Sequence, residues 1–145
     1  MKKLSVMHLQ KLRDKLDQLS TYYAELIEDL PNEEEFLRER MPRRAVEKTI
    51  ELIADTILDV ASIIISAQGF EKPKEASESV MVLSKHGILS KNLMLKIQDL
   101  IRFRNLLVHQ YAKIDEKREY ENIAENHPDI LAFVKEIEKF VKKSK

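Results

Sequence analysis

Apolar side chains recur at helical spacing along most of the chain. In the first segment they recur every three or four residues and so lie on one side of a helix. These residues are Leu9, Leu12, Leu16, Leu19, Tyr23, Leu26 and Leu30. Pro31 is expected to end this helix, and the polar, acidic stretch over residues 32–42 to be irregular or only briefly helical. No long run alternates apolar with polar residues, so the pattern predicts helices rather than strands.

A second apolar series is broader than the first. It comprises Val46, Ile50, Ile53, Ala54, Ile57, Val60, Ala61, Ile64 and Ile65. Because these residues cover more than one side of a helix, the helix is expected to lie centrally in the fold. Glu51, Asp55 and Asp59 interrupt the series, and each would be costly in lipid, so no membrane span is expected.

Glycine, proline and serine mark the next boundaries. Gly69 and Pro73 predict a break, and a shorter helix is expected over about residues 74–85. His86-Gly87 is expected to stop that helix, and Ser90 to act as the N-cap of the fourth helix.

The fourth helix is expected from residue 91 to about residue 110, followed by a polar link and a last helical segment. In this segment one helical phase is kept by Tyr120, Ile123, His127, Ile130, Val134, Ile137 and Val141. Pro128 lies inside this series, so the helix is expected to kink or break briefly there. The pattern predicts an all-α, antiparallel bundle of four to five helices in one domain over residues 1–145.

Composition excludes several kinds of site. The chain has 145 residues, 25 Lys and Arg against 25 Asp and Glu, and no Cys. Without Cys there is no disulfide framework, thiolate zinc site or cysteine nucleophile. A net charge of zero means that any contact with nucleic acid must come from a local patch. The first residues lack an unbroken apolar run, so a secretory signal is not expected and the default location is cytoplasmic.

The familiar metal and nucleotide motifs are also missing. The four histidines form no HxxxH pair and no HExxH motif, so a helical metal site is not expected. His8, His86 and His127 are expected to be structural. No GxxxxGK[ST], GxGxxG or GxSxG sequence occurs, which argues against a nucleotide-binding loop and a serine hydrolase elbow.

The fourth helix carries an arginine in the middle of its apolar face. That face comprises Leu93, Ile97, Leu100, Ile101, Phe103, Leu107 and Val108. Arg104 falls among them, and an arginine there lowers stability unless its guanidinium is paired or reaches a solvent-filled cleft. Tyr111, seven residues further on, lies almost directly in line with Arg104 along the helix. Asn105 and His109 lie on a different side, His109 about 140° around the helix from Arg104.

These residue types suit phosphoryl chemistry on RNA. Arginine can hold a phosphate and stabilise its developing charge, and histidine can exchange a proton near neutral pH. RNA supplies its own 2′-hydroxyl nucleophile, so no metal is required. The alternative is that Arg104 is a salt-bridge partner or extends to solvent along its aliphatic stem, and that His109 is a helix cap or a surface residue.

The run from Arg104 to Tyr111 reads R-N-x-x-x-H-x-Y and resembles the signature of the HepT-like toxins of the HEPN superfamily. These toxins are ribonuclease partners of minimal nucleotidyltransferase antitoxins. The resemblance extends over nearly the whole chain through Phe103, Lys113-Ile114-Asp115, Arg43-Arg44-Ala45-Val46-Glu47, Glu51, Asp59, Gly69 and Gly87-Ile88-Leu89.

The resemblance implies an all-helical homodimer in which two motifs face each other and form a composite, metal-independent ribonuclease site without a cofactor. It implies that Arg104 polarises the scissile phosphate, that His109 is the general acid and base, and that Asn105 assists. Tyr111 matches the tyrosine that the antitoxin adenylylates in some members, and an added AMP would block RNA by its charge and volume.

Two functional hypotheses follow. The first is an endoribonuclease toxin that cleaves cellular RNA as a homodimer and is neutralised by a nucleotidyltransferase antitoxin. The alternative is a non-catalytic helical subunit that binds nucleotide or substrate for a nucleotidyltransferase. Within one subunit Arg104 and His109 point in different directions, so a single copy places them poorly around one phosphate. Two facing copies would bring an arginine and a histidine to the same phosphate. The apolar face around Arg104 is expected to supply the dimer contact.

Two charged clusters accompany the motif. An acidic row on the second long helix consists of Glu47, Glu51, Asp55 and Asp59. Part of it is expected to orient Arg104 or another cation of the site, with Glu47, Glu51 and Asp59 as supporting residues, unless the row is a solvated face or pairs with a neighbouring helix. A basic cluster consists of Arg38, Arg40, Arg43 and Arg44; it could bind RNA backbone or the antitoxin, or form internal salt bridges in a solvated loop.

Overall fold

The computed structural model describes residues 1–109 and 114–145, and within them it contains α-helices and one 3₁₀ turn but no strand. In chain order the elements are α1 (Val6–Asp29), α2 (Glu33–Arg38), α3 (Arg40–Gln68), η1 (Ala76–Glu78), α4 (Ser79–Lys85), α5 (Lys91–His109), α6 (Glu116–Asn126) and α7 (Pro128–Lys143). The all-α prediction is confirmed.

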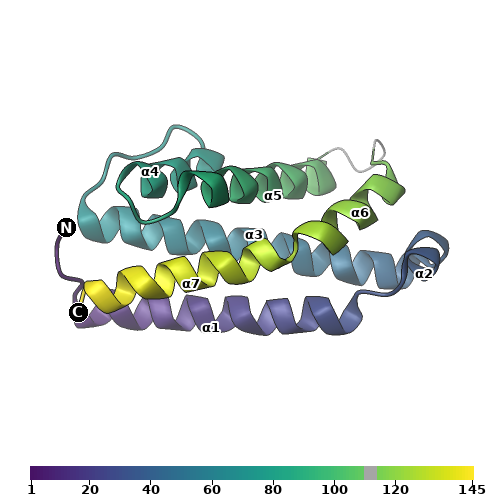
Figure 1. Cartoon of the computed structure of the whole chain (residues 1–145), viewed down its shortest axis with the longest axis horizontal. Coiled ribbons are helices and arrows are strands. Elements are labelled where there is room, and N and C mark those ends of the chain that lie inside the picture. The colour runs from purple at the N-terminus through teal and green to yellow at the C-terminus, as the bar shows by residue number, and fades with distance from the viewer. Residues whose placement is uncertain (110–113) are drawn as a thin grey trace.

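Four long helices, α1, α3, α5 and α7, alternate in direction and form the antiparallel bundle (Figure 1). Helix α3 packs against α1 and α5, and α7 packs against the same two helices from the other side. The short helices lie at the ends: α4 covers part of α3 and α5, and α2 contacts α3 and α6. The predicted bundle is correct, with extra short helices because residues 33–38 form α2 and the last segment divides in two. Residues 40–42, expected to be irregular or only briefly helical, already belong to α3.

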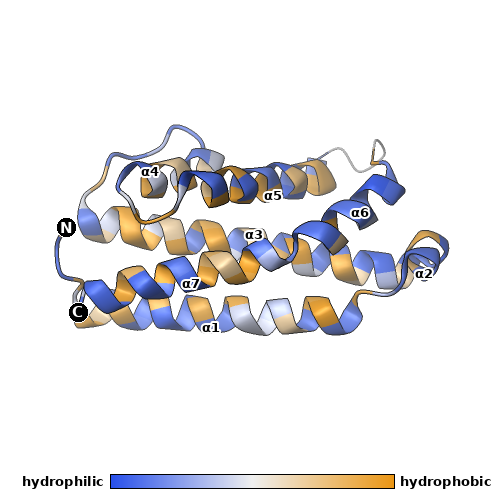
Figure 2. Cartoon of the chain, viewed as in Figure 1, coloured by the Kyte–Doolittle hydropathy of each residue, from blue (hydrophilic) through white to orange (hydrophobic). Residues whose placement is uncertain are grey.

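The core is one continuous cluster of aliphatic and aromatic side chains. Both predicted series contribute to it, and α3 contributes most, with a buried face that reaches from Val46 to Ile65. The expected central position of this helix is therefore confirmed. Figure 2 shows that α6 is almost entirely hydrophilic, and in this helix only Glu119 and Ile123 are buried.

Most of the helix boundaries lie where the sequence predicts them. Gly69 ends α3 with a φ of 69°, and Gly87 follows α4 with a φ of 78°, a left-handed conformation that glycine adopts without steric cost. Ser90 precedes α5 and its Oγ accepts a hydrogen bond from the backbone N–H of Leu93 at 3.3 Å, as expected of an N-cap. The chain breaks between Asn126 and Pro128, which confirms the predicted interruption.

The histidines predicted to be structural each contact a neighbouring side chain. Hydrogen bonds join His8 to Ser5 at 2.9 Å, His86 to Glu71 at 3.0 Å and His127 to Tyr23 at 2.8 Å. Each of them therefore holds local structure, which confirms the prediction. Among the described helices, none combines the length and apolar character needed to cross a bilayer.

Candidate functional site

Arg104 extends from the C-terminal half of α5 toward α3 and is held there by two polar partners. Its Nη2 lies 3.1 Å from Oδ1 of Asp55, and its Nη1 donates a hydrogen bond to Oδ1 of Asn105 at 3.1 Å. The Arg104 side chain is 21% exposed, and its Nε is buried without a hydrogen-bond partner. An arginine on an apolar face was expected to need a partner, and Asp55 is that partner.

Asp55 belongs to the acidic row, so the prediction that part of this row orients Arg104 is confirmed. The three residues named as supporting residues make other contacts within the subunit, and their supporting role stays a prediction. Glu51 lies 3.6 Å from Lys48 and Asp59 lies 3.0 Å from Lys15, while Glu47 interacts with Glu119. The sequence shows the row, but only the packing of α5 against α3 decides which turn of α3 meets Arg104.

His109 is the last residue of α5 and is exposed, as is Asn105. Because α5 is a continuous helix through the motif, the side chains of Arg104 and His109 leave it about 140° apart. Within one subunit the arginine is therefore directed at α3 and the histidine is directed outward. Tyr111, the residue matched to the adenylylated tyrosine, lies outside the described residues.

The apolar face around Arg104 is used inside the subunit. Ile97 and Ile101 are almost completely buried, and Leu93 and Leu107 are each at most 7% exposed. Of the apolar residues on this face, only Val108 is exposed, at 42%. Most of this face therefore packs against α3 and α7 within the subunit, and the part of it that stays available for the predicted dimer contact is the exposed Val108 with the half-buried Leu100 and Phe103.

A buried carboxyl pair lies between α3 and α6. Glu119 is 2% exposed and Glu47 is 7% exposed. Burial raises the pKa of the Glu119 carboxyl well above its ordinary value, and the hydrogen bond and negative charge of Glu47 raise it further. The positive charge of Arg43 acts in the opposite direction. The folded state therefore favours the neutral form of the Glu119 carboxyl over the charged form.

Arg43, next to this carboxyl pair, connects α3 to α2 and to the beginning of α6. It is 9% exposed, its Nη1 donates a hydrogen bond to the backbone oxygen of Phe36 at 2.8 Å, and its Nε lies 3.5 Å from Glu116 of α6. These contacts hold the beginning of α6 against α3. Glu119 is not among the residues predicted for the site, although its position one helical turn before the apolar Ile123 places it on the inward face.

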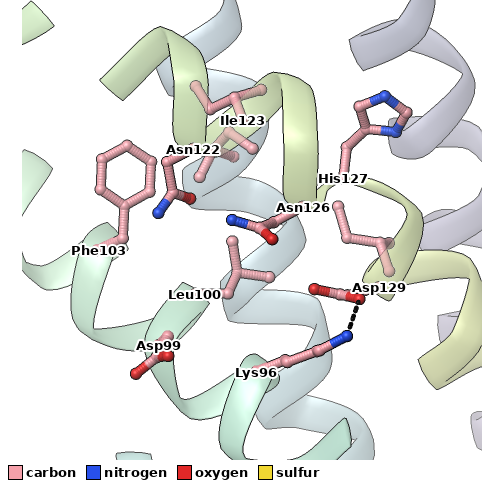
Figure 3. Close-up of a pocket in the computed structure, with 11 residues that line it drawn as sticks. Lys96, Asp99, Leu100, Phe103, Asn122, Ile123, Asn126, His127 and Asp129 are labelled. Carbon is pink, nitrogen blue, oxygen red and sulfur yellow. Dashed lines mark ion pairs between the residues drawn. The ribbon is translucent and has the colours of Figure 1, made fainter. Parts of the chain in front are cut away.

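A separate small cavity of about 80 Å³ lies where α5 meets α6 and α7 (Figure 3). Phe103 and Leu100 of α5 face the side-chain amides of Asn122 and Asn126 across it, and Lys96 pairs with Asp129 at 3.6 Å. These α5 residues lie on a different side of the helix from Asn105 and His109. The cavity is therefore separate from the side of α5 that carries Asn105 and His109.

The fold and the site together define a class of protein: an all-helical bundle in which one helix carries an arginine, held by an aspartate, and a histidine five residues later. The family model described as ribonuclease HepT-like matches residues 12–137, and the chain belongs to this family. No curated protein matches the chain in sequence.

Solved structures share the fold at low sequence identity. The cytosolic protein of unknown function YutE from Bacillus subtilis is 17% identical, with a TM-score of 0.81 over 99% of this chain and 94% of that one. A tri-AMPylated HEPN toxin from Shewanella oneidensis, in complex with an MNT antitoxin, is 15% identical, with a TM-score of 0.83 over 88% of this chain and 96% of that one. A mutant MntA–HpeT toxin–antitoxin structure is 14% identical, with a TM-score of 0.82 over 88% of this chain and 98% of that one.

Proposed function

We propose that the protein is a metal-independent endoribonuclease toxin that acts on cellular RNA as a homodimer. The observation that carries the proposal is the Arg104 guanidinium, which Asp55 and Asn105 hold in place on the helix that also carries His109. A guanidinium has five N–H donors, and these two contacts use only part of them, so donors remain for a phosphate. Membership of the HepT-like ribonuclease family supports the same reaction class.

In the proposed reaction the RNA 2′-hydroxyl attacks the adjacent phosphorus. His109 accepts the hydroxyl proton as the new P–O bond forms, and the protonated imidazole then donates this proton to the 5′-oxygen as the bond from phosphorus to that oxygen breaks. Arg104 stabilises the negative charge that develops on the phosphate oxygens. Because Arg104 and His109 diverge within one subunit, the complete site is proposed to combine Arg104 of one copy with His109 of a second copy.

The proposed partner is a nucleotidyltransferase antitoxin. The solved HEPN toxin that shares this fold is AMPylated and in complex with an MNT antitoxin. In this chain Tyr111 is the candidate acceptor of AMP, two residues after His109. A bulky anion attached there would exclude RNA from the neighbouring histidine by charge and by volume.

The proposal is tested by incubating the purified protein with RNA in the presence of EDTA, beside Arg104→Ala and His109→Ala variants. We expect the wild type to cleave RNA and each variant to be at least about 100-fold slower, as is usual when a general acid–base or a charge-stabilising group is lost. Circular dichroism of each variant serves as the folding control. Intact RNA in all three samples would contradict the proposal and favour the alternative, a non-catalytic subunit of a nucleotidyltransferase complex.

A further inference from the structure

An exposed stripe on α3 leads from the beginning of this helix to Arg104. The residues of the stripe are three or four positions apart and so share one side of α3; they are Arg40, Arg44, Lys48, Glu51 and Asp55. Arg40, Arg44 and Lys48 are exposed, and Glu51 and Asp55 are half-buried. Because Asp55 binds Arg104, the stripe ends at the candidate site.

The four arginines of the basic cluster have different environments in the structure. Arg43 is buried and donates a hydrogen bond to the backbone oxygen of Phe36, so it is used in packing within the subunit. Arg38 forms ion pairs with Glu34 at 3.1 Å and Glu39 at 3.2 Å. The internal salt bridges weighed for this cluster therefore exist at Arg38 and Arg43, and Arg40 and Arg44 lie on the stripe.

The charge of the stripe favours an anionic ligand. Its two carboxylates, Glu51 and Asp55, face Lys48 at 3.6 Å and Arg104 at 3.1 Å, respectively. Arg40 and Arg44 add further positive charge, so the stripe together with Arg104 is positive. The Lys48 side chain is 63% exposed, and an exposed ion pair of this kind opens at little cost. In a chain of zero net charge, a local surplus of this kind is what RNA binding requires.

We propose that Arg44 and Lys48, with Arg40 beyond them, bind the phosphates of the RNA strand next to the scissile phosphate, so that the strand lies along the first half of α3. The inference rests on the proposed function and extends it by naming a binding surface outside the R-x-x-x-x-H motif. Residues four apart on a helix are separated by about 6 Å along its axis, so the side chains reach different phosphates. Contacts to phosphates position the strand and carry no base specificity.

The test measures binding without cleavage. Full-length His109→Ala protein is titrated into fluorescent single-stranded RNA at several salt concentrations, with and without the added substitutions Arg44→Gln and Lys48→Gln. Each phosphate contact to a single strand contributes about 0.7 to the slope of log K against log salt, so loss of both is expected to reduce the slope by about 1.4 and to weaken binding. Lys139→Gln with Lys142→Gln removes the same charge from exposed positions on α7 and is expected to change neither quantity.

Arg44 also takes part in interactions within the chain, so Lys48→Gln alone is measured as a second variant and thermal unfolding is recorded for all of them. If the α3 variants match the α7 control in affinity and slope while RNA binding by the His109→Ala protein persists, the inference is wrong and the proposed function stands. If the α3 variants bind RNA normally but lose the nucleotidyltransferase, the stripe is an antitoxin surface instead. If the parent protein neither binds nor cleaves RNA, the proposed function itself fails.

Discussion

Arg104 shows how a single ionic contact prepares a side chain for chemistry. Its guanidinium is drawn to α3 by Asp55, which is itself 44% exposed, so the pair contributes little to stability and its main effect is on orientation. A group that is held in place before the substrate arrives loses less entropy during the reaction. Asp55 is therefore a positioning residue of the proposed ribonuclease.

We predict that Asp55→Asn lowers kcat for RNA cleavage by about 10- to 100-fold through misplacement of Arg104, with a smaller change in KM. The matched control is Asp59→Asn, one helical turn further along α3, where the carboxylate pairs with Lys15 on α1 and not with Arg104. Steady-state kinetics of both variants decide the prediction. Equal kcat values for Asp55→Asn and Asp59→Asn would contradict a positioning role.

Glu119 is expected to make stability depend on pH. Burial raises its pKa in the folded protein, and Glu47 and Glu116 add to this effect while Arg43 opposes it. In the unfolded chain a glutamic acid has a pKa of about 4.3, so between this pH and the raised pKa of the folded state the folded protein binds more protons than the unfolded chain. The stabilisation from the neutral carboxyl is complete below the unfolded pKa and is lost as the pH rises toward the folded pKa.

We therefore predict that Glu119→Gln, which keeps the neutral shape, flattens this pH dependence. Urea unfolding at pH 5 and pH 8 gives the free energy of unfolding of both proteins. The value for the variant minus the value for wild type is expected to be larger at pH 8 than at pH 5. Glu121→Gln changes an exposed residue on the same helix and is the control. The assignment fails if wild type and Glu119→Gln lose the same free energy of unfolding between the two pH values.

At the scale of the elements, the connection between α4 and α5 depends on a glycine. Gly87 has a φ of 78°, and a Cβ added there would meet no atom within 4 Å. A substitution at this position is therefore opposed by backbone conformation alone and not by crowding. Ser90 then caps α5, so this short connection sets where the helix that carries Arg104 and His109 begins.

We predict that Gly87→Ala lowers the free energy of unfolding by about 1–2 kcal/mol, the cost of a left-handed conformation for a residue with a Cβ. Gly87→Asn should cost less, because asparagine tolerates this conformation better. Chemical denaturation compares the two variants. Equal losses would show that something other than the backbone angle is responsible.

The elements also show where local reasoning succeeds and fails. The ends of α3 and α4 and the N-cap of α5 follow from glycine and serine, whose effects depend on their immediate neighbours in the chain. The partner of Arg104 does not follow in this way. Asp55 and Asp59 are equally acidic and one helical turn apart, and only the packing of α5 and α1 against α3 gives them different partners, Arg104 and Lys15.

At the scale of the whole molecule, the divergence of Arg104 and His109 within a subunit points to an assembly. We predict a homodimer with twice the chain mass of 17.0 kDa at micromolar concentration, measured by light scattering. Most of the apolar face of α5 is buried in the subunit, so a contact through this helix is expected to involve its exposed Val108 and half-buried neighbours. A monomeric mass would contradict the composite site.

Complementation tests the composite site directly. Arg104→Ala and His109→Ala subunits, each inactive alone, are coexpressed so that mixed dimers form. If each site takes its arginine from one subunit and its histidine from the other, a mixed dimer has one intact site and the mixture regains up to about a quarter of wild-type cleavage. If mixed dimers form but do not cleave RNA, the arginine and the histidine of each site belong to the same subunit.

The sequence by itself determined the helices, most of their boundaries, the central place of α3 and the motif from Arg104 to Tyr111, because these depend on periodicity and on residues a few positions apart. Only the tertiary structure decided that Asp55 and not Glu51 or Asp59 holds Arg104, and that Glu119 and Arg43 are buried together. The same holds for the basic cluster, where Arg43 faces inward and Arg44 outward. The physical reason is that burial and ionic pairing depend on how helices distant in sequence pack against each other, which no local pattern records.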